Sequence, residues 1–511
     1  MLSEKKITQL ILAATALFTV IMGALIFVHP PALYPDPGWG FKVMRSMQAG
    51  SPFNTLISPD HEDIAQNGSV FLSWWSPGQY LVPYFFISVF KLKMGPAVAL
   101  TISLCSLCGL AGLNTFFKKI GFPPLISAVS IAFIASQQIY LIPFIFYNGG
   151  EVILFAFTGW FLYGCCYFTR VSWQLMIFVL LSGVVGFFCK SAFLWIYLAG
   201  LAYLWIRLST GSKIVSWLIN GISIGVPAVL SLATIYLGYL SKGDNPAANV
   251  NGIKWAWETF CFPLASPLLT ALPIDDFSNG IINYPVGITI VLALLSVALI
   301  VYLCKTTPNS SYTLLVLILY GVAVLFYSIN FLRQANISYE ARHMRIIGLV
   351  ITPGIIYALS KINRVYWLLF ALIWLYIIKV NYTFLSTGYE RNVSSSGHGS
   401  TGLAQVFIDQ PTLNYLSALD AAQRNAIFVF ITPDAGLEIN HNRVITYPEI
   451  DDNLQPQNDF DKYAGHKGPL YIVLPKSYVG TKASMYFKNF PGYSNFELAQ
   501  PGKNYVIYSA K

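Results

Sequence analysis

The chain has 511 residues, of which 55% are hydrophobic and only 10% are charged, and its mean hydropathy is +0.59. Because a soluble domain carries about a quarter charged residues, this composition excludes an ordinary soluble protein. The net charge of +9 is spread over many short loops and does not form the concentrated basic region that nucleic-acid binding needs. The seven cysteines show neither a disulfide framework nor zinc-site spacing; six fall in or beside apolar segments, and Cys261 lies in a loop that reads as polar.

Apolar runs of roughly 18 to 24 residues recur along the chain and predict a multi-pass α-helical membrane protein. The first run, 7–28, follows Lys5 and Lys6 as in a signal peptide. No small-residue cleavage site follows it, so we expect a retained span. We expect about eleven transmembrane helices in all. They start near Ile7, Pro96, Pro123, Gly150, Ser172, Ala192, Ile214, Pro285, Tyr312, Arg345 and Val365.

The run at 74–90, WWSPGQYLVPYFFISVF, decides the topology. Two prolines and a glycine interrupt it, and its Trp and Tyr residues are typical of segments anchored at lipid headgroups. Taken as an interfacial or re-entrant segment, it leaves the basic residues of the short loops, such as Lys118 and Lys119, inside. The N-terminus is then inside. Outside lie a first loop (about 29–95), a second long loop (near 239–284) read as no more than a substrate-facing lid, and the C-terminal part.

Polarity rises after residue 384, and the stretch 386–402, STGYERNVSSSGHGSTG, reads as a flexible linker. A helical pattern, QPTLNYLSALDAAQ, follows, and then the short β-rich runs AIFVFIT, RVITY, PLYIVLP and NYVIYSA. Helix and strands mixed in this way predict a small soluble α/β or α+β domain. We therefore divide the chain into a transmembrane domain, 1–384, and an extracytoplasmic domain, 385–511.

The stretch PDPGWGFKVMRSMQAGSPFN, residues 35–54, follows the first span and contains one acid, Asp36. Its pattern predicts a helix over 38–49 that lies on the membrane, with apolar residues on one side and Lys42 and Arg45 on the other. Asp36 is a candidate general base, since such a base must be held rigidly near its substrate. The alternative is an N-cap, because Asp before Pro-Gly is a common helix start. The spacing alone does not decide between the two.

Further along the same loop, SPDHEDIAQNGS holds Asp60, His61, Glu62 and Asp63. A histidine beside carboxylates can bind a cation, so these residues are candidates for a second acid, an acceptor contact or a metal ligand. Solvated loop side chains are the alternative, and no single residue is favoured. Glu151, at the outer start of the fourth span, is a candidate partner for a cation, or an acid that favours a helix N-terminus.

Two segments place cations at the outer face. Lys190, in GFFCKSAFLW, interrupts two apolar runs at a tight turn and needs an anionic partner, unless it snorkels to the interface. The stretch YEARHMR gathers Arg342, His343 and Arg345 outside, against the topological bias. Arginine suits bidentate phosphate recognition, and pairing within the loop, as between Glu340 and an Arg, is the alternative. We favour phosphate contacts for both segments.

Together these features resemble the GT-C superfamily of integral-membrane glycosyltransferases, which includes protein O-mannosyltransferases and aminoarabinose transferases. The resemblance covers about residues 5–385. The family's acidic first-loop motif resembles DPGWGFKVMRSMQAGSPFN, and its Pro-rich segment before the second span resembles SWWSPGQYLVPYFFISVFKLKMG. GVVGFFCKSAFLW is similar to its Lys-containing turn, and YEARHMR to its outer Arg motif. Several relatives have an acidic pair where only Asp36 stands here, so metal use is unknown.

The resemblance implies sugar transfer from a polyprenyl-phosphate donor, with Asp36 as general base and inversion of the anomeric centre. Lys190, Arg342, His343 and Arg345 would bind the donor phosphate. The acceptor would be a lipid, glycan or protein, membrane lipids are further partners, and a divalent metal stays open. The expected location is a bacterial inner membrane with a periplasmic active face. A lipid-linked oligosaccharide transporter and a polysaccharide polymerase or ligase are the rival functions.

Overall fold

A computed structural model gives the structure of the chain and describes residues 3–244, 252–272, 286–307, 309–362, 364–449 and 461–511. The chain forms two compact units, and each is made of three segments that are separate in the sequence. The helical unit comprises Met1–Ile21, Ser103–Ile142 and Gly150–Phe384. The mixed unit comprises Met22–Ile102, Pro143–Gly149 and Leu385–Lys511. The first outer loop and the C-terminal part thus belong to one compact unit. Our division of the chain into a transmembrane domain, 1–384, and an extracytoplasmic domain, 385–511, stays a prediction.

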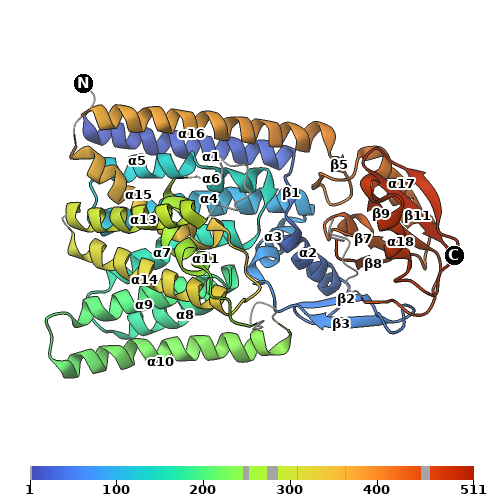
Figure 1. Cartoon of the computed structure of the whole chain (residues 1–511), viewed down its shortest axis with the longest axis horizontal. Helices are drawn as coiled ribbons and strands as arrows, with labels where there is room; N and C mark the ends of the chain where they lie inside the picture. The colour runs from blue at the N-terminus through green and yellow to red at the C-terminus, as the bar shows by residue number, and fades with distance from the viewer. Residues whose placement is uncertain (1–2, 245–251, 273–285, 308, 363, 450–460) are drawn as a thin grey trace. The chain divides into compact units, whose positions relative to one another are not determined.

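The helical unit consists of long apolar helices that run roughly in one direction (Figure 1). Each predicted span coincides with a helix. The helices that lie wholly or partly in this unit are α1 (Glu4–Val28), α4 (Met94–Lys119), α5 (Pro124–Ala135), α6 (Gln138–Leu141), α7 (Gly150–Tyr167), α8 (Trp173–Cys189), α9 (Phe193–Ser209), α10 (Ile214–Gly238), α11 (Trp257–Ala271), α13 (Val286–Thr306), α14 (Ser310–Leu332), α15 (Arg345–Ser360) and α16 (Arg364–Glu390), with the 3₁₀ turns η1 (Ile142–Phe144), η2 (Leu240–Lys242) and η4 (Ala341–Met344).

These helices confirm a multi-pass membrane protein. Among the described residues, eight helices are long and apolar enough to cross a bilayer, and a bent pair would make nine. The helices α8 and α9 are also apolar but have only 17 residues each, at the short end of what a span needs. The count of eleven therefore stays a prediction.

The span predicted to start near Pro123 is broken. Helix α5 ends at Ala135, and the helical segment that follows turns by 66°. At the break, Trp374 Nε1 donates to Ser136 Oγ at 2.8 Å, and Asn381 Nδ2 donates to the Ser136 carbonyl at 2.8 Å. Both donors come from α16. They satisfy polar groups that a lipid-exposed break would leave unpaired.

Helix α11 lies within the segment that the sequence indicated to be an outer loop. Cys261 is buried in this helix, so its assignment to a polar loop was wrong. Two internal prolines, Pro263 and Pro267, interrupt the helical hydrogen bonds. Neighbouring helices bond to the backbone beside them: Tyr320 donates to the Leu264 carbonyl at 2.7 Å, and Leu268 N donates to Ser296 Oγ at 3.3 Å. A short apolar run with two prolines reads as a loop unless these partners are known. Most of the remaining predicted lid lies outside the described residues.

The mixed unit begins with the first outer loop. Strand β1 (Ala32–Leu33) pairs in parallel with β4 (Phe146–Tyr147) and leads into α2 (Pro35–Gln48). A hairpin of β2 (Thr55–Pro59) and β3 (Asn67–Phe71) follows, and then the 13-residue helix α3 (Gly78–Phe90). Helix α3 is too short to cross a bilayer of ordinary thickness. Its length agrees with our interpretation of residues 74–90 as an interfacial or re-entrant segment.

The C-terminal part contains a five-stranded mixed sheet in the order β10-β11-β9-β7-β8 (Figure 1). Strand β7 pairs in parallel with β8 and β9, whereas β11 pairs antiparallel with β9 and β10. One apolar core lies on each face, with α17 over one and α18 over the other. The small α/β or α+β domain is therefore confirmed. The bounds are α17 (Gln410–Ala422), β7 (Ile427–Phe430), η6 (Ala435–Glu438), β8 (Arg443–Thr446), β9 (Leu470–Pro475), η7 (Lys476–Tyr478), α18 (Thr481–Phe487), β10 (Glu497–Pro501) and β11 (Tyr505–Ala510).

The predicted flexible linker is largely ordered secondary structure. Helix α16 continues to Glu390 and is followed by the π-helical turn η5 (Arg391–Ser395), β5 (Gly397–His398) and β6 (Ala404–Gln405). The helix continues because its polar end packs on protein: a Cβ on Gly388 would lie 2.6 Å from the Ile145 side chain. Composition alone could not indicate this contact.

The hairpin of the first loop docks onto the C-terminal sheet domain. Ile64, at the hairpin tip, is fully buried in one of the two sheet cores. Its N–H donates to the Ala464 carbonyl at 2.8 Å, and Ala464 N–H donates to the His61 carbonyl at 2.9 Å. Burying an isoleucine contributes roughly 1.5 to 3 kcal/mol. This contact helps to explain why two segments so distant in sequence form one compact unit.

Lys42 of α2 is buried, with 8% of its surface exposed. Its Nζ donates to Thr446 Oγ1 at 2.5 Å and lies 5.0 Å from the ring centroid of Trp39. None of the ion pairs within the described segments includes Lys42. Burial without a carboxylate partner lowers the pKa of Lys42 from 10.5 to about 7.

Replacing Lys42 with Met is expected to stabilise the protein more at pH 6 than at pH 9. The folded-state pKa lies below the value of 10.5, so the unfolded chain binds more protons between about pH 7 and pH 10.5, and wild-type stability rises with pH across that window. Thermal unfolding in detergent at the two pH values measures the gain in Tm. The exposed Lys503→Met is the matched control. A gain for Lys42→Met that does not change with pH would contradict the lowered pKa.

Candidate functional site

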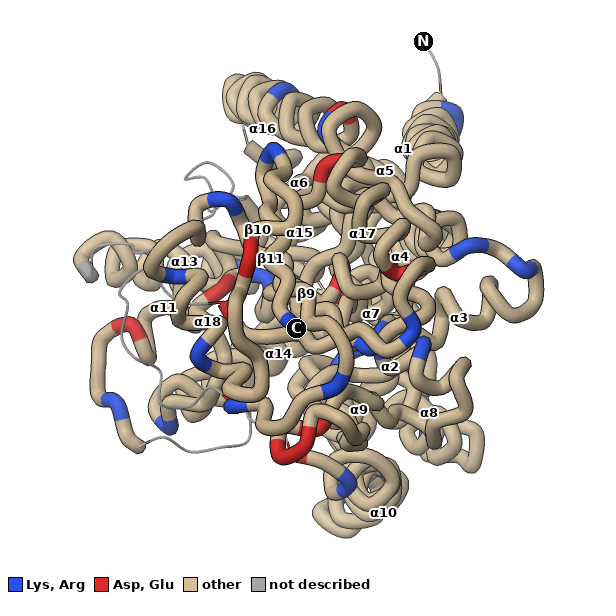
Figure 2. Tube along the Cα trace, turned by 90° about the vertical axis from the view of Figure 1, so that its right-hand side faces the viewer, with Lys and Arg blue, Asp and Glu red and all other residues tan. Residues whose placement is uncertain are grey.

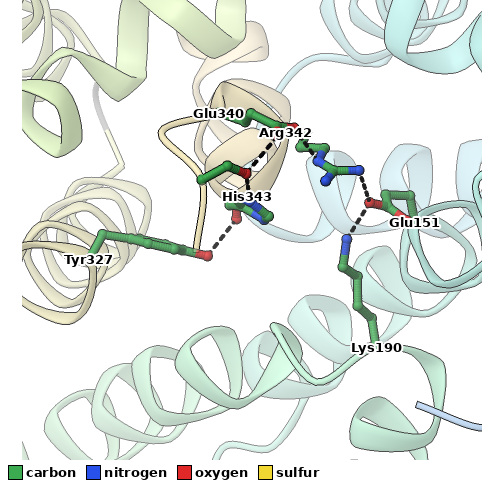
Figure 3. Close-up of polar contacts among 7 residues, drawn as sticks. Glu151, Lys190, Tyr327, Glu340, Arg342 and His343 are labelled. Atoms are coloured by element: carbon green, nitrogen blue, oxygen red, sulfur yellow. Dashed lines mark hydrogen bonds and ion pairs between the residues drawn. The ribbon is translucent and has the colours of Figure 1, made fainter. Parts of the chain in front are cut away.

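Three charged side chains of the helical unit converge at the ends of apolar helices. Glu151 lies in the first turn of α7, Lys190 follows α8, and Arg342 lies in η4 (Figure 3). Lys190 Nζ donates to Glu151 Oε1, and Arg342 NH1 lies 3.7 Å from the same oxygen. The side chains of Glu151 and Lys190 are only 18% and 19% exposed. One carboxylate therefore holds a lysine and an arginine side by side.

The local fold explains how the lysine reaches this place. Lys190 has an extended backbone between α8 and α9, and its carbonyl accepts a hydrogen bond from Phe193 N–H at 2.9 Å. The tight turn leaves the ammonium at the helix ends. A Cβ on Gly150 would lie 2.9 Å from the Cys189 carbonyl and 3.2 Å from Lys190 Cβ. Only glycine lets the start of α7 come this close.

The loop before α15 positions the arginine. Arg342 Nε pairs with Glu340, whose Oε1 also accepts a hydrogen bond from Ser338 at 2.6 Å. Tyr327 of α14 donates to the His343 carbonyl at 2.9 Å and fixes the backbone of η4 (Figure 3). The internal pairing that the sequence left open as an alternative is thus present. Because Glu340 is 44% exposed, its carboxylate can be displaced by a stronger anion.

The other two residues predicted to contact phosphate, His343 and Arg345, lie close by in sequence. His343 also belongs to η4, and its Nε2 lies 3.4 Å from Ser338 Oγ. Arg345 is the first residue of α15 and is half-buried. The phosphate-binding role predicted for Lys190, Arg342, His343 and Arg345 stays a prediction, and the structure brings the first two of them onto one carboxylate.

Asp36 belongs to the mixed unit. Helix α2 begins at Pro35, earlier than the predicted start at residue 38, because proline fits the first helical position. Tyr34 is the N-cap residue and makes no side-chain cap, so the N-cap interpretation of Asp36 was wrong. Asp36 is a half-buried acid in the first turn, where a negative charge favours the helix dipole.

Small residues around Asp36 permit close packing. A Cβ on Gly38 would lie 2.8 Å from Pro433 Cγ. Gly149, with φ of +62°, would place a Cβ 2.8 Å from Gln79 Oε1 and 3.2 Å from Pro37 Cβ. The backbone directly after Asp36 is therefore closely packed against its neighbours, as a rigidly placed base requires.

The four-residue cluster in the β2–β3 turn has local partners. Asp60 Oδ1 accepts a hydrogen bond from Glu62 N–H at 2.8 Å, and Asp63 Oδ1 accepts one from Ala65 N–H at 2.9 Å. His61 Nδ1 lies 3.8 Å from Asp60 Oδ1. These bonds shape the turn. Among the residues that the structure describes, no group of three or more His, Cys, Asp or Glu side chains is arranged to hold a metal ion.

No protein-family model matches the chain, and no curated protein matches it. Solved structures do match over nearly the whole chain. ArnT from Cupriavidus metallidurans bound to undecaprenyl phosphate superposes with a TM-score of 0.56 at 12% identity, covering 97% of each chain. Apo ArnT gives 0.53 at 13%, covering 99% of this chain and 98% of that one. The arabinofuranosyltransferase AftD from Mycobacteria gives 0.53 at 13%, covering 99% of this chain but 40% of AftD.

The chain has a GT-C-like fold. This fold confirms the architectural resemblance that the sequence showed over about residues 5–385. Within the GT-C-like fold, the sequence did not indicate Tyr327, because a tyrosine in an apolar helix carries no signal of its own. It also gave no sign that Glu151 would hold both Lys190 and Arg342, only that it might hold a cation.

Proposed function

We propose that the protein transfers a sugar from a polyprenyl-phosphate-linked donor to an acceptor on the outer face of a membrane. The convergence of Lys190 and Arg342 on Glu151 carries this proposal. ArnT, with the same fold, has been solved with undecaprenyl phosphate bound. We place the protein in a bacterial inner membrane with the active face towards the periplasm, and the acceptor is a lipid, glycan or protein.

The cation cluster suits a phosphate at the membrane boundary. Arginine binds phosphate through two parallel N–H groups, whereas lysine acts as a point charge. On donor binding, the phosphate replaces Glu340 at Arg342, while Glu151 keeps both cations in place. As the sugar leaves, negative charge grows on the phosphate, and fixed cations stabilise that charge. Arg345 extends the positive field, and the imidazole of His343 offers a further hydrogen-bonding group.

An apolar groove supports a lipid-linked donor. It has a volume of about 430 Å³ and lies between α11 and α14, lined by Phe260, Leu264, Tyr320 and Leu325 among others. Its walls also include Ser328, next to the Tyr327 that anchors η4. An isoprenoid chain is wholly apolar, so burying it in such a groove is favourable. Helix α14 thus both lines the groove and carries the tyrosine that bonds to η4.

Asp36 is proposed as the general base, on the strength of the acidic first-loop motif. It would accept the proton of the acceptor hydroxyl, whose oxygen attacks the anomeric carbon as the bond to phosphate breaks. A single displacement of this kind inverts the anomeric centre. No metal is assigned a step.

The rival function, a lipid-linked oligosaccharide transporter, makes a different structural demand. Inverted-repeat carriers place broken helices at corresponding positions in two halves. In the described parts of the chain, one bent helix pair is found, α5 with the segment after it. Transfer is therefore the function we test first.

The test uses the purified protein in sealed vesicles with fluorescent polyprenyl-phosphate sugars and an envelope extract as the source of acceptor. We expect protein-dependent release of free polyprenyl phosphate and labelling of the extract. Movement of the intact donor to the other leaflet, without cleavage, would indicate a transporter and contradict the proposal.

A further inference from the structure

A second pocket lies wholly within the mixed unit. Its volume is about 920 Å³, within the range of small-molecule sites. One wall is a face of α2, a second is the β2–β3 hairpin, and the third comes from the C-terminal part, including η6 and β8. Figure 2 colours the basic positions of the chain blue, and some of them lie on α2.

The pocket is positively charged. Lys42, Arg45 and Arg443 line it, and none of its lining residues in the described part of the chain is acidic. The arginines stay charged at any working pH, and Lys42 adds charge as the pH falls. The carboxylates that balance Arg45, those of Glu438 and Asp420, stand outside the lining. The charged residues among the described lining of the pocket are therefore all basic.

Hydrogen bonds hold these cations in place and leave one donor unused. Arg45 NH1 donates to the Ile439 carbonyl at 2.9 Å. Arg443 NH1 donates to the Gln66 carbonyl at 3.1 Å and to Asn67 Oδ1 at 3.2 Å. Within the described residues, Arg443 NH2 is buried without a hydrogen-bond partner. A buried donor without an acceptor costs free energy, and the charge of this guanidinium, which lines the pocket, is stabilised by a nearby anion.

The pocket is distinct from the proposed transfer centre. In an α-helix, residues six and nine positions apart lie about 240° and 180° around the axis. Lys42 and Arg45 stand six and nine positions after Asp36, on the other side of α2. Asp36 does not line the pocket. The proposed donor cations, Lys190 and Arg342, do not line it either.

We propose that this pocket binds an anionic saccharide, with the acidic group on Arg45 and Arg443 and the sugar hydroxyls on the neighbouring polar side chains. Ser58, Asn67 and Ser400 line the same volume and offer hydroxyl and amide groups. The pocket thus gives the extracytoplasmic part of the protein a carbohydrate site of its own. Binding there requires no transfer at Asp36, so it stands independently of the proposed function.

Isothermal titration of the full-length protein in detergent tests the site with four probes: maltose 1-phosphate, digalacturonate, neutral maltose and glycerol 3-phosphate. We expect maltose 1-phosphate and digalacturonate to bind and maltose not to bind. Tighter binding of maltose 1-phosphate or of digalacturonate shows whether the site prefers a phosphate or a carboxylate. Glycerol 3-phosphate binding as tightly as maltose 1-phosphate would mean that a phosphate alone is recognised, as on a lipid headgroup, and would overturn the saccharide assignment.

Variants locate the site. Arg443→Gln is expected to weaken binding of the anionic probes by about tenfold or more, whereas Arg424→Gln, on the exposed surface of the same part, is expected to leave it unchanged. Because Arg443 also holds the hairpin, Ser58→Trp is the second variant. Ser58 lines the pocket, and its partner across the hairpin, Gly68, has no side chain. An indole at position 58 therefore occupies pocket volume without removing a cation. Unchanged binding in both variants, or no binding of any anionic probe to the wild type, would overturn the proposal.

Discussion

Replacing Asp36 with Asn is expected to lower the rate of sugar transfer by about a hundredfold to ten-thousandfold, the usual contribution of a general base. Asparagine keeps the shape of the side chain but cannot accept the proton of the acceptor hydroxyl. The donor should still bind, because its phosphate is proposed to rest on Lys190 and Arg342. Single-turnover transfer and donor affinity, measured on the same preparation, separate the two effects.

The structure sharpens this test. Since Asp36 is not an N-cap, the change to Asn removes no cap. It weakens the interaction of a charge with the helix dipole, typically worth 0.3–1 kcal/mol of stability. Asp60→Asn is the matched control in the same loop, because Asn keeps the oxygen that Glu62 N–H donates to. A wild-type rate for Asp36→Asn would remove its catalytic role and weaken the glycosyltransferase proposal, since this acid carries much of the resemblance. A large loss for Asp60→Asn would move the search to the hairpin turn.

Arg342→Ala is expected to weaken binding of a polyprenyl-phosphate donor by about tenfold to a hundredfold, the effect of losing a charge-assisted hydrogen bond. Arg333→Ala, an exposed arginine at the start of the same loop, is the matched control and should leave the affinity unchanged. Glu340→Gln should keep or raise the affinity, because the carboxylate that competes for Arg342 is gone. The affinities of all three variants are measured in detergent with a fluorescent analogue of undecaprenyl phosphate.

Lys190→Ala should weaken donor binding similarly, but it also leaves Glu151 with Arg342 alone. Removing one partner of a buried pair can destabilise a protein by about 3 kcal/mol. The double variant Glu151→Gln with Lys190→Ala removes the unpaired carboxylate and separates loss of folding from loss of binding. Full donor affinity in Arg342→Ala and in this double variant would make the cluster a structural ion-pair network.

The sequence predicted the features that depend on local composition. Apolar runs located the helices, and the short apolar, β-rich runs AIFVFIT and PLYIVLP located β7 and β9. It failed where distant segments supply partners. The prolines of α11 looked like loop punctuation, but Ser296 and Tyr320 complete that helix. Strand β10, with the pattern ELAQP, forms because β11 offers it an edge.

The candidate site shows the same division. Lys190 and Arg342 were found because charges beside apolar runs are costly and conspicuous. Their common partner Glu151 was named as a candidate partner for a cation, but not for these two, since nothing in the spacing of residues 151, 190 and 342 indicates contact. The cationic pocket was missed altogether. Its walls come from α2, the first-loop hairpin and β8, and no local pattern brings these together.

A structure of the protein with undecaprenyl phosphate bound tests the central claim most directly. The account predicts the phosphate in contact with Lys190 Nζ and the Arg342 guanidinium, Glu340 turned away from Arg342, and the isoprenoid chain in the groove between α11 and α14. A phosphate bound elsewhere, with the Glu340–Arg342 pair intact, would contradict it.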